Sequence, residues 1–211
     1  MTKIKFSLGL IILSVLFVNK TGAQETGTFT DVRDGKVYKT VKIGTQVWFA
    51  ENLAFKSETN CWVYEDKESN SAVYGCLYNF ESAQNVCPDG WHLPSDEEWE
   101  LMTESLNAEY GPFQKNKDKD WEEMGDILKS KYGWFNDVNG TDLVGFNALP
   151  AGCYKTAGMP YAGIYIFTEW WTSTLKKKND AWIRGLYFHT AELGRDTKDK
   201  SMGYSVRCVQ D

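Results

Sequence analysis

The stretch Cys87-Pro-Asp-Gly-Trp-His-Leu-Pro-Ser-Asp-Glu-Glu-Trp99 contains the start of the main helix that the sequence predicts. A Pro-Asp-Gly turn is followed by Ser95, and Glu98 lies three residues further on. A serine and a glutamate at this spacing form a capping box, which satisfies free backbone N–H groups at a helix start. Trp99, Met102 and Leu106 then fall on one helical face. The pattern predicts a helix that begins after Ser95 and packs inward.

Two β-hairpins are predicted before this helix. Asp34-Gly35 is a strong two-residue turn signal between the runs Phe29–Val32 and Lys36–Ile43. In the second run apolar and polar residues alternate, as in a half-buried strand. Gly44-Thr45 turns the chain back into Gln46–Ala50. The N-terminal part of the domain is therefore expected to be a small antiparallel sheet.

The remaining elements complete the pattern of strands, then helices, then strands. Short strands are predicted at Cys61–Tyr64 and Tyr74–Asn79 with a polar loop at Asp66–Ser71 between them, and helices at Phe80–Val86 and Trp121–Tyr132. The last third is expected to return to strands, at Phe146–Leu149, Gly163–Phe167, Trp170–Thr174, Ala181–Phe188 and Tyr204–Val209. This order favours a segregated α+β domain over an alternating parallel one.

Residues 1–23 have the features of a signal peptide. Lys3 and Lys5 precede the apolar run Phe6–Val18, and small residues ending at Ala23 suit a cleavage site. Thirteen apolar residues are too few for a helix that crosses a bilayer, which needs about 20, so no stable membrane span is expected. The mature chain would be one domain, residues 24–211, that is secreted, periplasmic or held at the cell surface.

Charge and cysteine content narrow the classes of protein further. The chain has 211 residues and a net charge of −6. Cleavage removes three lysines, which leaves 20 basic against 29 acidic residues and a charge of −9. This balance argues against a nucleic-acid partner. Five cysteines would enter an oxidising compartment, where disulfides persist, and the odd number leaves at least one thiol unpaired within the chain.

Six blocks of sequence resemble the Fibrobacter succinogenes major paralogous domain family of exported bacterial proteins. The resemblance covers residues 27–211 in order. Its blocks are Tyr38–Trp48 with Ala50–Leu53, Tyr74–Phe80, Cys87–Asp96, Ala148–Gly152, Trp170–Thr174 and Gly203–Cys208. The run Leu93–Trp99 is also similar to a motif of the formylglycine-generating and sulfatase-modifying enzymes.

This resemblance implies a fold and one disulfide. The implied fold is a compact C-type-lectin-like α+β domain, with N-terminal hairpins, two to three central helices, C-terminal strands and the two termini paired in one sheet. Cys87 and Cys208 lie in the two most family-like blocks, so a structural bridge between them is expected. A second bridge among Cys61, Cys76 and Cys153 stays open between a Cys76–Cys153 and a Cys61–Cys76 pairing.

Two groups of residues are candidates for ligand contact. Trp62, Trp134, Trp170 and Trp182 lie near predicted loops and could stack on sugar rings, although a place in the core is the more common role of a tryptophan. Asp137, Asn139 and Asp142 surround Gly140 with oxygen ligands that suit calcium. That segment lacks the full EF-hand series, so a solvated turn is favoured and no cofactor is expected.

The sequence predicts a binding protein. His92 and His189 are the only imidazoles, and we find neither a zinc-type spacing nor a nucleophile elbow around a serine. The expected function is therefore non-catalytic binding of an extracellular glycan or protein. The alternatives are a structural module of a surface assembly and, less favoured, an enzyme related to the formylglycine-generating enzymes.

Overall fold

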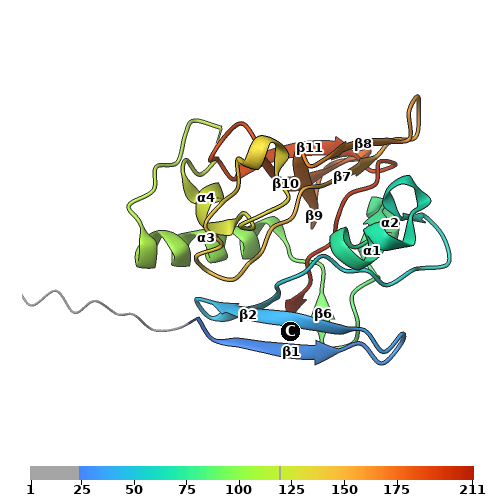
Figure 1. The fold of residues 1–211 in the computed structure, drawn as a ribbon, viewed down its shortest axis with the longest axis horizontal. Helices are drawn as coiled ribbons and strands as arrows, with labels where there is room; N and C mark the ends of the chain where they lie inside the picture. Colours follow the sequence, from blue (N-terminus) through green and yellow to red (C-terminus); the bar gives the residue numbers. More distant parts are fainter. Residues whose placement is uncertain (1–23, 119) are drawn as a thin grey trace, which may run out of the picture.

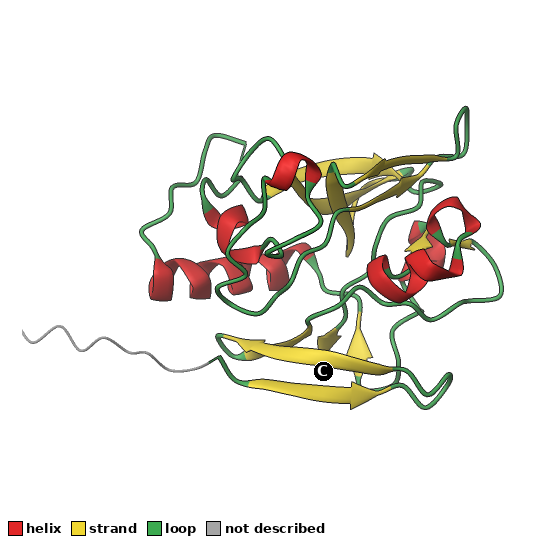
Figure 2. Cartoon of the chain, viewed as in Figure 1, coloured by secondary structure: helices red, strands yellow, loops and turns green. Residues whose placement is uncertain are grey.

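The computed structural model describes residues 24–118 and 120–211, so the predicted signal peptide lies outside the described residues. Two sheets lie on opposite sides of the molecule in Figure 1, with helices α3 and α4 towards one end and α1 and α2 towards the other. Long loops connect these elements (Figure 2). The fold is a mixed α+β domain that consists mostly of sheet, in agreement with the predicted class.

The first sheet joins the two ends of the described chain. Its strand order is β1-β2-β3-β12-β6, with β1 (Thr26–Thr30), β2 (Val37–Ile43), β3 (Gln46–Phe49), β12 (Val209–Gln210) and β6 (Trp91–His92). Both N-terminal hairpins are confirmed: β1 pairs with β2 and β2 with β3, all antiparallel. Val209 of β12 pairs with Trp48 on one side and His92 on the other.

The second sheet is built from the last third of the chain. Its order is β11-β10-β9-β7-β8, with β11 (Gly194–Asp199), β10 (Asp180–Tyr187), β9 (Phe167–Lys177), β7 (Ala151–Tyr154) and β8 (Tyr161–Ile164). A separate two-stranded sheet pairs β4 (Cys61–Trp62) with β5 (Leu77–Tyr78). The helical elements are η1 (Tyr64–Asp66), α1 (Glu68–Tyr74), α2 (Phe80–Ala83), α3 (Asp96–Tyr110), α4 (Met124–Leu128) and η2 (Phe135–Asp137).

Helix α3 starts as the capping pattern predicts. The Glu98 backbone N–H donates to Ser95 Oγ at 3.1 Å, and the Ser95 backbone N–H donates to Glu98 Oε2 at 2.7 Å. Trp99, Met102 and Leu106 are all buried against the larger of two hydrophobic clusters. Helix α3 thereby closes one side of the core that the two sheets share.

Several predicted elements differ from the structure. Helix α1 occupies most of the expected loop at Asp66–Ser71, and α4 is much shorter than Trp121–Tyr132 because Glu123 takes a left-handed φ of 64° before it and Lys129 is extended after it. Phe146–Leu149 forms only an isolated bridge at Ala148. Strand β11 was not predicted because its sequence, GRDTKD, lacks an apolar alternation. Charged residues of this kind are common on edge strands.

Candidate functional site

Two of the four candidate tryptophans belong to the core, which corrects the prediction for them. Trp134 is buried, and its indole N–H donates to Ser130 Oγ and to the Ala148 carbonyl. Trp170 is fully buried, and its indole N–H donates to Asn52 Oδ1 at 2.9 Å. Neither ring is available to stack on a ligand, because packing and hydrogen bonding already use both faces and the polar edge.

The other two candidates are partly exposed but already have partners. Trp62 stacks on Tyr154 with ring centroids 3.9 Å apart. The Arg195 guanidinium lies 3.3 Å above the Trp182 ring, and the Lys176 ammonium lies 4.7 Å from it. These stacking and cation–π contacts occupy the aromatic faces that a sugar would need.

The cysteines form one bridge among the described residues. Cys87 and Cys208 are disulfide-bonded, as the resemblance implied. Cys61, Cys76 and Cys153 are free thiols, so neither expected second pairing is present. Cys61 and Cys76 nevertheless lie in side-chain hydrogen-bond contact, and their thiols also approach the carbonyls of Phe55 and Ala54, at 4.0 and 3.3 Å. Burial, and then the charge of Glu169, raise the pKa of Cys153 to about 11.

The loop proposed as a calcium candidate uses its oxygens on its own backbone. Asn139 Oδ1 accepts from the Trp134 N–H at 3.1 Å, and Asp142 Oδ1 accepts from the Asn147 N–H at 2.7 Å. Asp137 belongs to the 3₁₀ turn η2. Within residues 24–118 and 120–211, no group of three or more His, Cys, Asp or Glu side chains could hold a metal ion. The arrangement of this loop is that of a self-capped turn.

A pocket of about 310 Å³ lies between α1, the segment after β3 and the loops that follow α4. Its polar and aromatic lining comes from Lys39, Glu51, Asn52, Tyr132, Asn147 and Arg207. A larger hollow of about 470 Å³, beside Phe80 and Lys200, has no buried charged side chain among its lining residues. The first pocket is distinct because a buried guanidinium and an exposed tyrosine both line it.

Arg207 lies at the floor of this pocket and is only 1% exposed. Its Nε donates to Asn52 Oδ1 at 2.9 Å, and its Nη1 donates to the carbonyls of Phe49 and Phe146. Its Nη2 donates to the Asn147 carbonyl at 3.2 Å. All four acceptors are neutral. Burial lowers the pKa of Arg207 to about 9, while the charges of Glu51 and Asp142 act in the opposite direction.

Asn52 organises the floor by using both ends of its amide. Its Oδ1 accepts from Trp170 and Arg207, and its Nδ2 donates to the Tyr74 carbonyl at 3.0 Å and to Ser205 Oγ at 3.3 Å. These partners come from β9, from the segment before β12 and from α1. One side chain therefore ties the pocket floor to elements far apart in the sequence.

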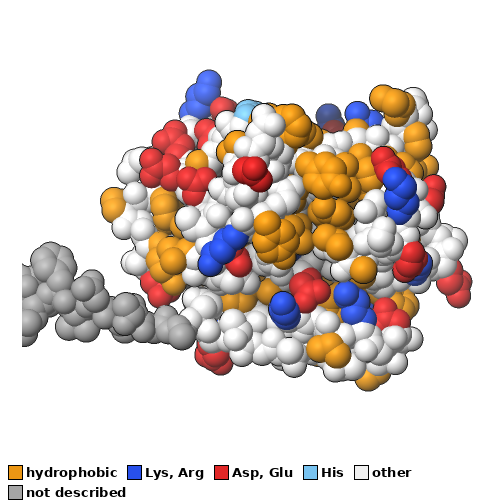
Figure 3. Space-filling view, viewed as in Figure 1, with side chains coloured by type: hydrophobic (Ala, Val, Ile, Leu, Met, Phe, Trp, Pro, Cys, Tyr) orange, Lys and Arg blue, Asp and Glu red, His pale blue; other side chains and the backbone are white. Residues whose placement is uncertain are grey.

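Three neighbouring tyrosines, which we call the tyrosine rim, are Tyr132, which lines the pocket, and Tyr74 and Tyr165, which lie near Tyr132 but are not lining residues. Tyr132 lines the pocket and is 58% exposed. Tyr74 ends α1, next to the lining residue Val73, and its ring meets that of Tyr165 edge to face at 6.2 Å. Burial, with Tyr165 and Tyr132 nearby, raises the pKa of Tyr74 to about 12. Figure 3 shows hydrophobic side chains gathered on this face, between η2 and α1.

Tyr165 is held in an uncommon backbone conformation. Its φ is 68°, its N–H donates to the Pro150 carbonyl at 3.1 Å, and its carbonyl accepts from the Phe135 N–H at 2.8 Å. A non-glycine residue in the left-handed region is strained, and such strain is concentrated at functional sites. The fold holds this aromatic side chain at the surface, where it is 48% exposed.

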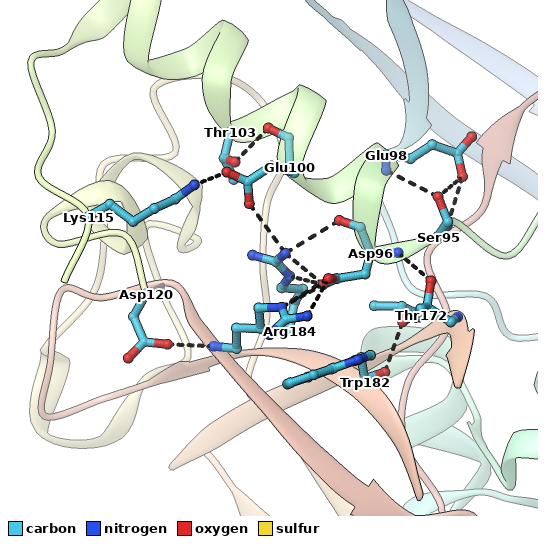
Figure 4. A network of polar contacts seen from close by, with 12 residues as sticks. Ser95, Asp96, Glu98, Glu100, Thr103, Lys115, Asp120, Thr172, Trp182 and Arg184 are labelled. Carbon is cyan, nitrogen blue, oxygen red and sulfur yellow. Dashed lines mark hydrogen bonds and ion pairs between the residues drawn. The ribbon is translucent and has the colours of Figure 1, made fainter. Parts of the chain in front are cut away.

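A second polar cluster lies at the start of α3 and has a structural role. Asp96 accepts from both Arg184 and Arg195, with shortest distances of 2.6 and 2.7 Å (Figure 4). Arg184 also lies 3.5 Å from Glu100, and the Arg195 N–H donates to Asp120 Oδ1. These contacts fasten α3 to β10 and β11.

Sequence reasoning did not find the pocket residues as a site. Arg207, Asn52 and Tyr74 lie in blocks that carried the family resemblance, but nothing in the pattern says that they meet. Tyr132 was predicted only as the end of a helix. A signal did exist in the run Val206-Arg207-Cys208, because an arginine between apolar residues of a terminal strand is unusual in a core.

The fold and the pocket together define a class: a small disulfide-bonded α+β domain with a polar pocket lined by an exposed tyrosine. The chain belongs to the family described as the Fibrobacter succinogenes major domain, whose model matches residues 41–210. No curated protein and no solved structure matches the chain. Within the described residues, none of the helices combines the length and apolar character needed to span a membrane.

Proposed function

We propose that this chain is an exported, non-catalytic domain that binds a glycan in the pocket lined by Tyr132. The observation that carries the proposal is the pairing of an exposed aromatic ring, Tyr132, with a polar floor made of Asn52 and Arg207. Tyrosine offers a rigid apolar face together with a hydroxyl. A sugar ring presents both an apolar face and hydroxyl groups, so it can use both features of the pocket.

The size of the pocket favours a sugar over a folded protein. Small-ligand sites are concave, with volumes from about 300 Å³ upward, whereas a stable protein interface buries roughly 800 Å² on each partner. The volume of about 310 Å³ falls in the first class. Tyr132 and Tyr165, which are 58% and 48% exposed, offer aromatic surface beyond the pocket that an oligosaccharide could contact.

The export and fold parts of the proposal rest on different observations. Residues 1–23 have the signal-peptide pattern. A C-type-lectin-like fold is supported by the pairing of the first and last segments in one sheet and by the disulfide that joins the segment before α3 to the chain end. The high pKa of the buried Cys153 thiol argues against that cysteine as a nucleophile, since the thiolate is the nucleophilic form.

The test is isothermal titration of the mature chain, residues 24–211, with a panel of neutral and uronic-acid oligosaccharides. At least one probe should bind, and Tyr132→Ala should weaken its binding about tenfold, because a central aromatic contact contributes more than 1 kcal/mol. Tyr154→Ala is the matched control. It removes a tyrosine from the stack with Trp62, away from the pocket, and should leave the affinity unchanged.

The outcomes separate the alternatives. If no oligosaccharide binds and the purified chain self-associates, an assembly module replaces the glycan-binding proposal. If a probe binds but only Tyr154→Ala weakens its binding, the glycan site is the stack of Trp62 on Tyr154 and not this pocket.

A further inference from the structure

We infer that the sugar taken by this pocket is anionic, and that it is a uronic acid whose carboxylate faces the guanidinium of Arg207. The inference rests on the proposed function and specifies the chemical class of its ligand. It comes from the charges around the pocket floor, which the protein's own groups leave uncompensated.

The first observation is a buried cation without an anion beside it. Among residues 24–118 and 120–211, no carboxylate lies within ion-pair distance of Arg207, although Arg184, also buried, contacts both Asp96 and Glu100. Buried charges in proteins are normally paired, because removal from water is expensive. Burial lowers the pKa of Arg207 to about 9, and the charges of Glu51 and Asp142 offset this only in part.

The second observation is an unused donor on the same group. A guanidinium has five N–H donors. The described chain accepts four of them, two from Nη1 and one each from Nε and Nη2. One N–H of Nη2 is left for a ligand in the pocket that Arg207 lines. A charge-assisted hydrogen bond from this donor to a carboxylate is about twice as strong as a neutral one.

The charged groups on the pocket wall suit a group with a single negative charge. Lys39 lines the pocket, and within the described chain its ammonium has no ion pair. The only acidic lining residue, Glu51, already accepts from the Lys39 backbone N–H and lies 3.8 Å from the Lys36 ammonium. Among the lining residues alone, two cations and one partnered carboxylate leave one excess positive charge; Asp142, which also acts on Arg207, is not a lining residue. A carboxylate balances this charge, whereas a phosphate dianion exceeds it.

The experiment compares matched sugar probes by isothermal titration of the mature chain. The probes are a short oligogalacturonate, the same oligomer as its methyl ester, a neutral oligogalactoside and a sulfated oligogalactoside. The oligogalacturonate should bind at least tenfold more tightly than its ester, which keeps the ring and loses the charge. Its affinity should fall as salt is added, because salt screens the attraction between charges.

Two variants of wall residues test the charge argument without disturbing the floor. Lys39→Ala should weaken oligogalacturonate binding about fivefold, and Glu51→Gln should tighten it by a similar factor, because each removes one charge near the carboxylate. Gln at position 51 can still accept from the Lys39 N–H. Replacing Arg207 itself would break four hydrogen bonds of the floor, so the informative changes are those on the wall.

The results distinguish the two levels of the proposal. Equal binding of the acid and its ester, with no effect of either wall variant, overturns the anionic ligand and leaves the glycan function standing. If the sulfated probe binds tightly and the oligogalacturonate does not, the inference that the ligand carries a carboxylate is overturned. Failure of every probe in the panel overturns the glycan function as well.

Discussion

Asn52 connects three segments that meet only in the folded chain, and it accepts a hydrogen bond that helps to hold Arg207 in place. The amide oxygen of Asn52 accepts hydrogen bonds from Trp170 Nε1 and Arg207 Nε, both at 2.9 Å. An aspartate of the same shape would lose the donors that hold Tyr74 and Ser205. The pocket floor therefore requires an amide side chain at position 52. The hydrogen bond from Arg207 Nε to this amide helps to fix the orientation of the guanidinium.

His92 links the chain end to the start of α3. Its Nδ1 lies 2.6 Å from Asp211 and its Nε2 lies 2.7 Å from Glu98. Burial acts to lower the pKa of His92, but the hydrogen bonds with the two carboxylates outweigh it and the pKa rises above the ordinary 6.5. Burial acts to raise the pKa of Glu98, but hydrogen bonds from Ser95 and His92 lower it.

We predict that His92 stabilises the fold only in acidic to neutral solution. A raised folded-state pKa contributes stability that is fully present below the unfolded value of 6.5 and is lost as pH rises through the folded value. The advantage of the wild type over His92→Gln in urea denaturation should be largest near about pH 6 and should shrink by about pH 9. An advantage that grows with pH would contradict the protonated pairing.

At the scale of elements, the attachment of α3 to the second sheet depends on one carboxylate. Asp96 lies in the first turn of α3, and its carboxylate accepts hydrogen bonds from Arg184 of β10 and Arg195 of β11. Burial acts to raise the pKa of Asp96, but the two arginines lower it. The Arg184 side chain is 1% exposed, so it cannot turn to water if Asp96 is removed.

We predict that Asp96→Ala destabilises the fold by about 3 kcal/mol, because it leaves buried arginine charge without its main partner. The measurement is the midpoint of urea denaturation at neutral pH. Asp118→Ala is the control: this residue is exposed, and its removal should change stability by less than about 0.5 kcal/mol. Equal effects of the two substitutions would show that the Asp96 network does not hold α3.

Predictability from sequence also differs from one element to the next. The start of α3 and both N-terminal hairpins were predictable because capping, turn and alternation signals are local. Helix α1 was not, because the sequence ESNSAVY has no N-cap side chain and little apolar periodicity. Its place is set by tertiary contacts, such as the bond from Asn52 to the Tyr74 carbonyl.

At the scale of the whole molecule, the Cys87–Cys208 disulfide spans 121 residues and encloses most of the domain. Restricting the unfolded chain over a loop of this length contributes about 5 kcal/mol in the chain-entropy description. We predict that the double variant Cys87→Ser/Cys208→Ser loses most of this stability in chemical denaturation.

Thiol alkylation of the unfolded, unreduced mature chain should label three cysteines per molecule; a single labelled cysteine would contradict this pairing scheme.

The functional site was the least predictable part of the molecule. Aromatic richness in the sequence indicated binding, but two of the four tryptophan candidates are core residues. Trp134 and Trp170 support the core, while the exposed aromatic side chain that lines the pocket is Tyr132. Arg207 could be recognised as a candidate ligand-binding residue only from its burial and its neutral hydrogen-bond acceptors. The local sequence does not predict which carbonyl groups a side chain will contact in the folded chain.

A crystal structure of the mature chain with a bound oligogalacturonate tests the central claim most directly. The account predicts a sugar ring against Tyr132 with its carboxylate within hydrogen-bond distance of Arg207 Nη2. A ligand bound instead against Trp62 and Tyr154, with the pocket at Arg207 holding only water, would contradict it.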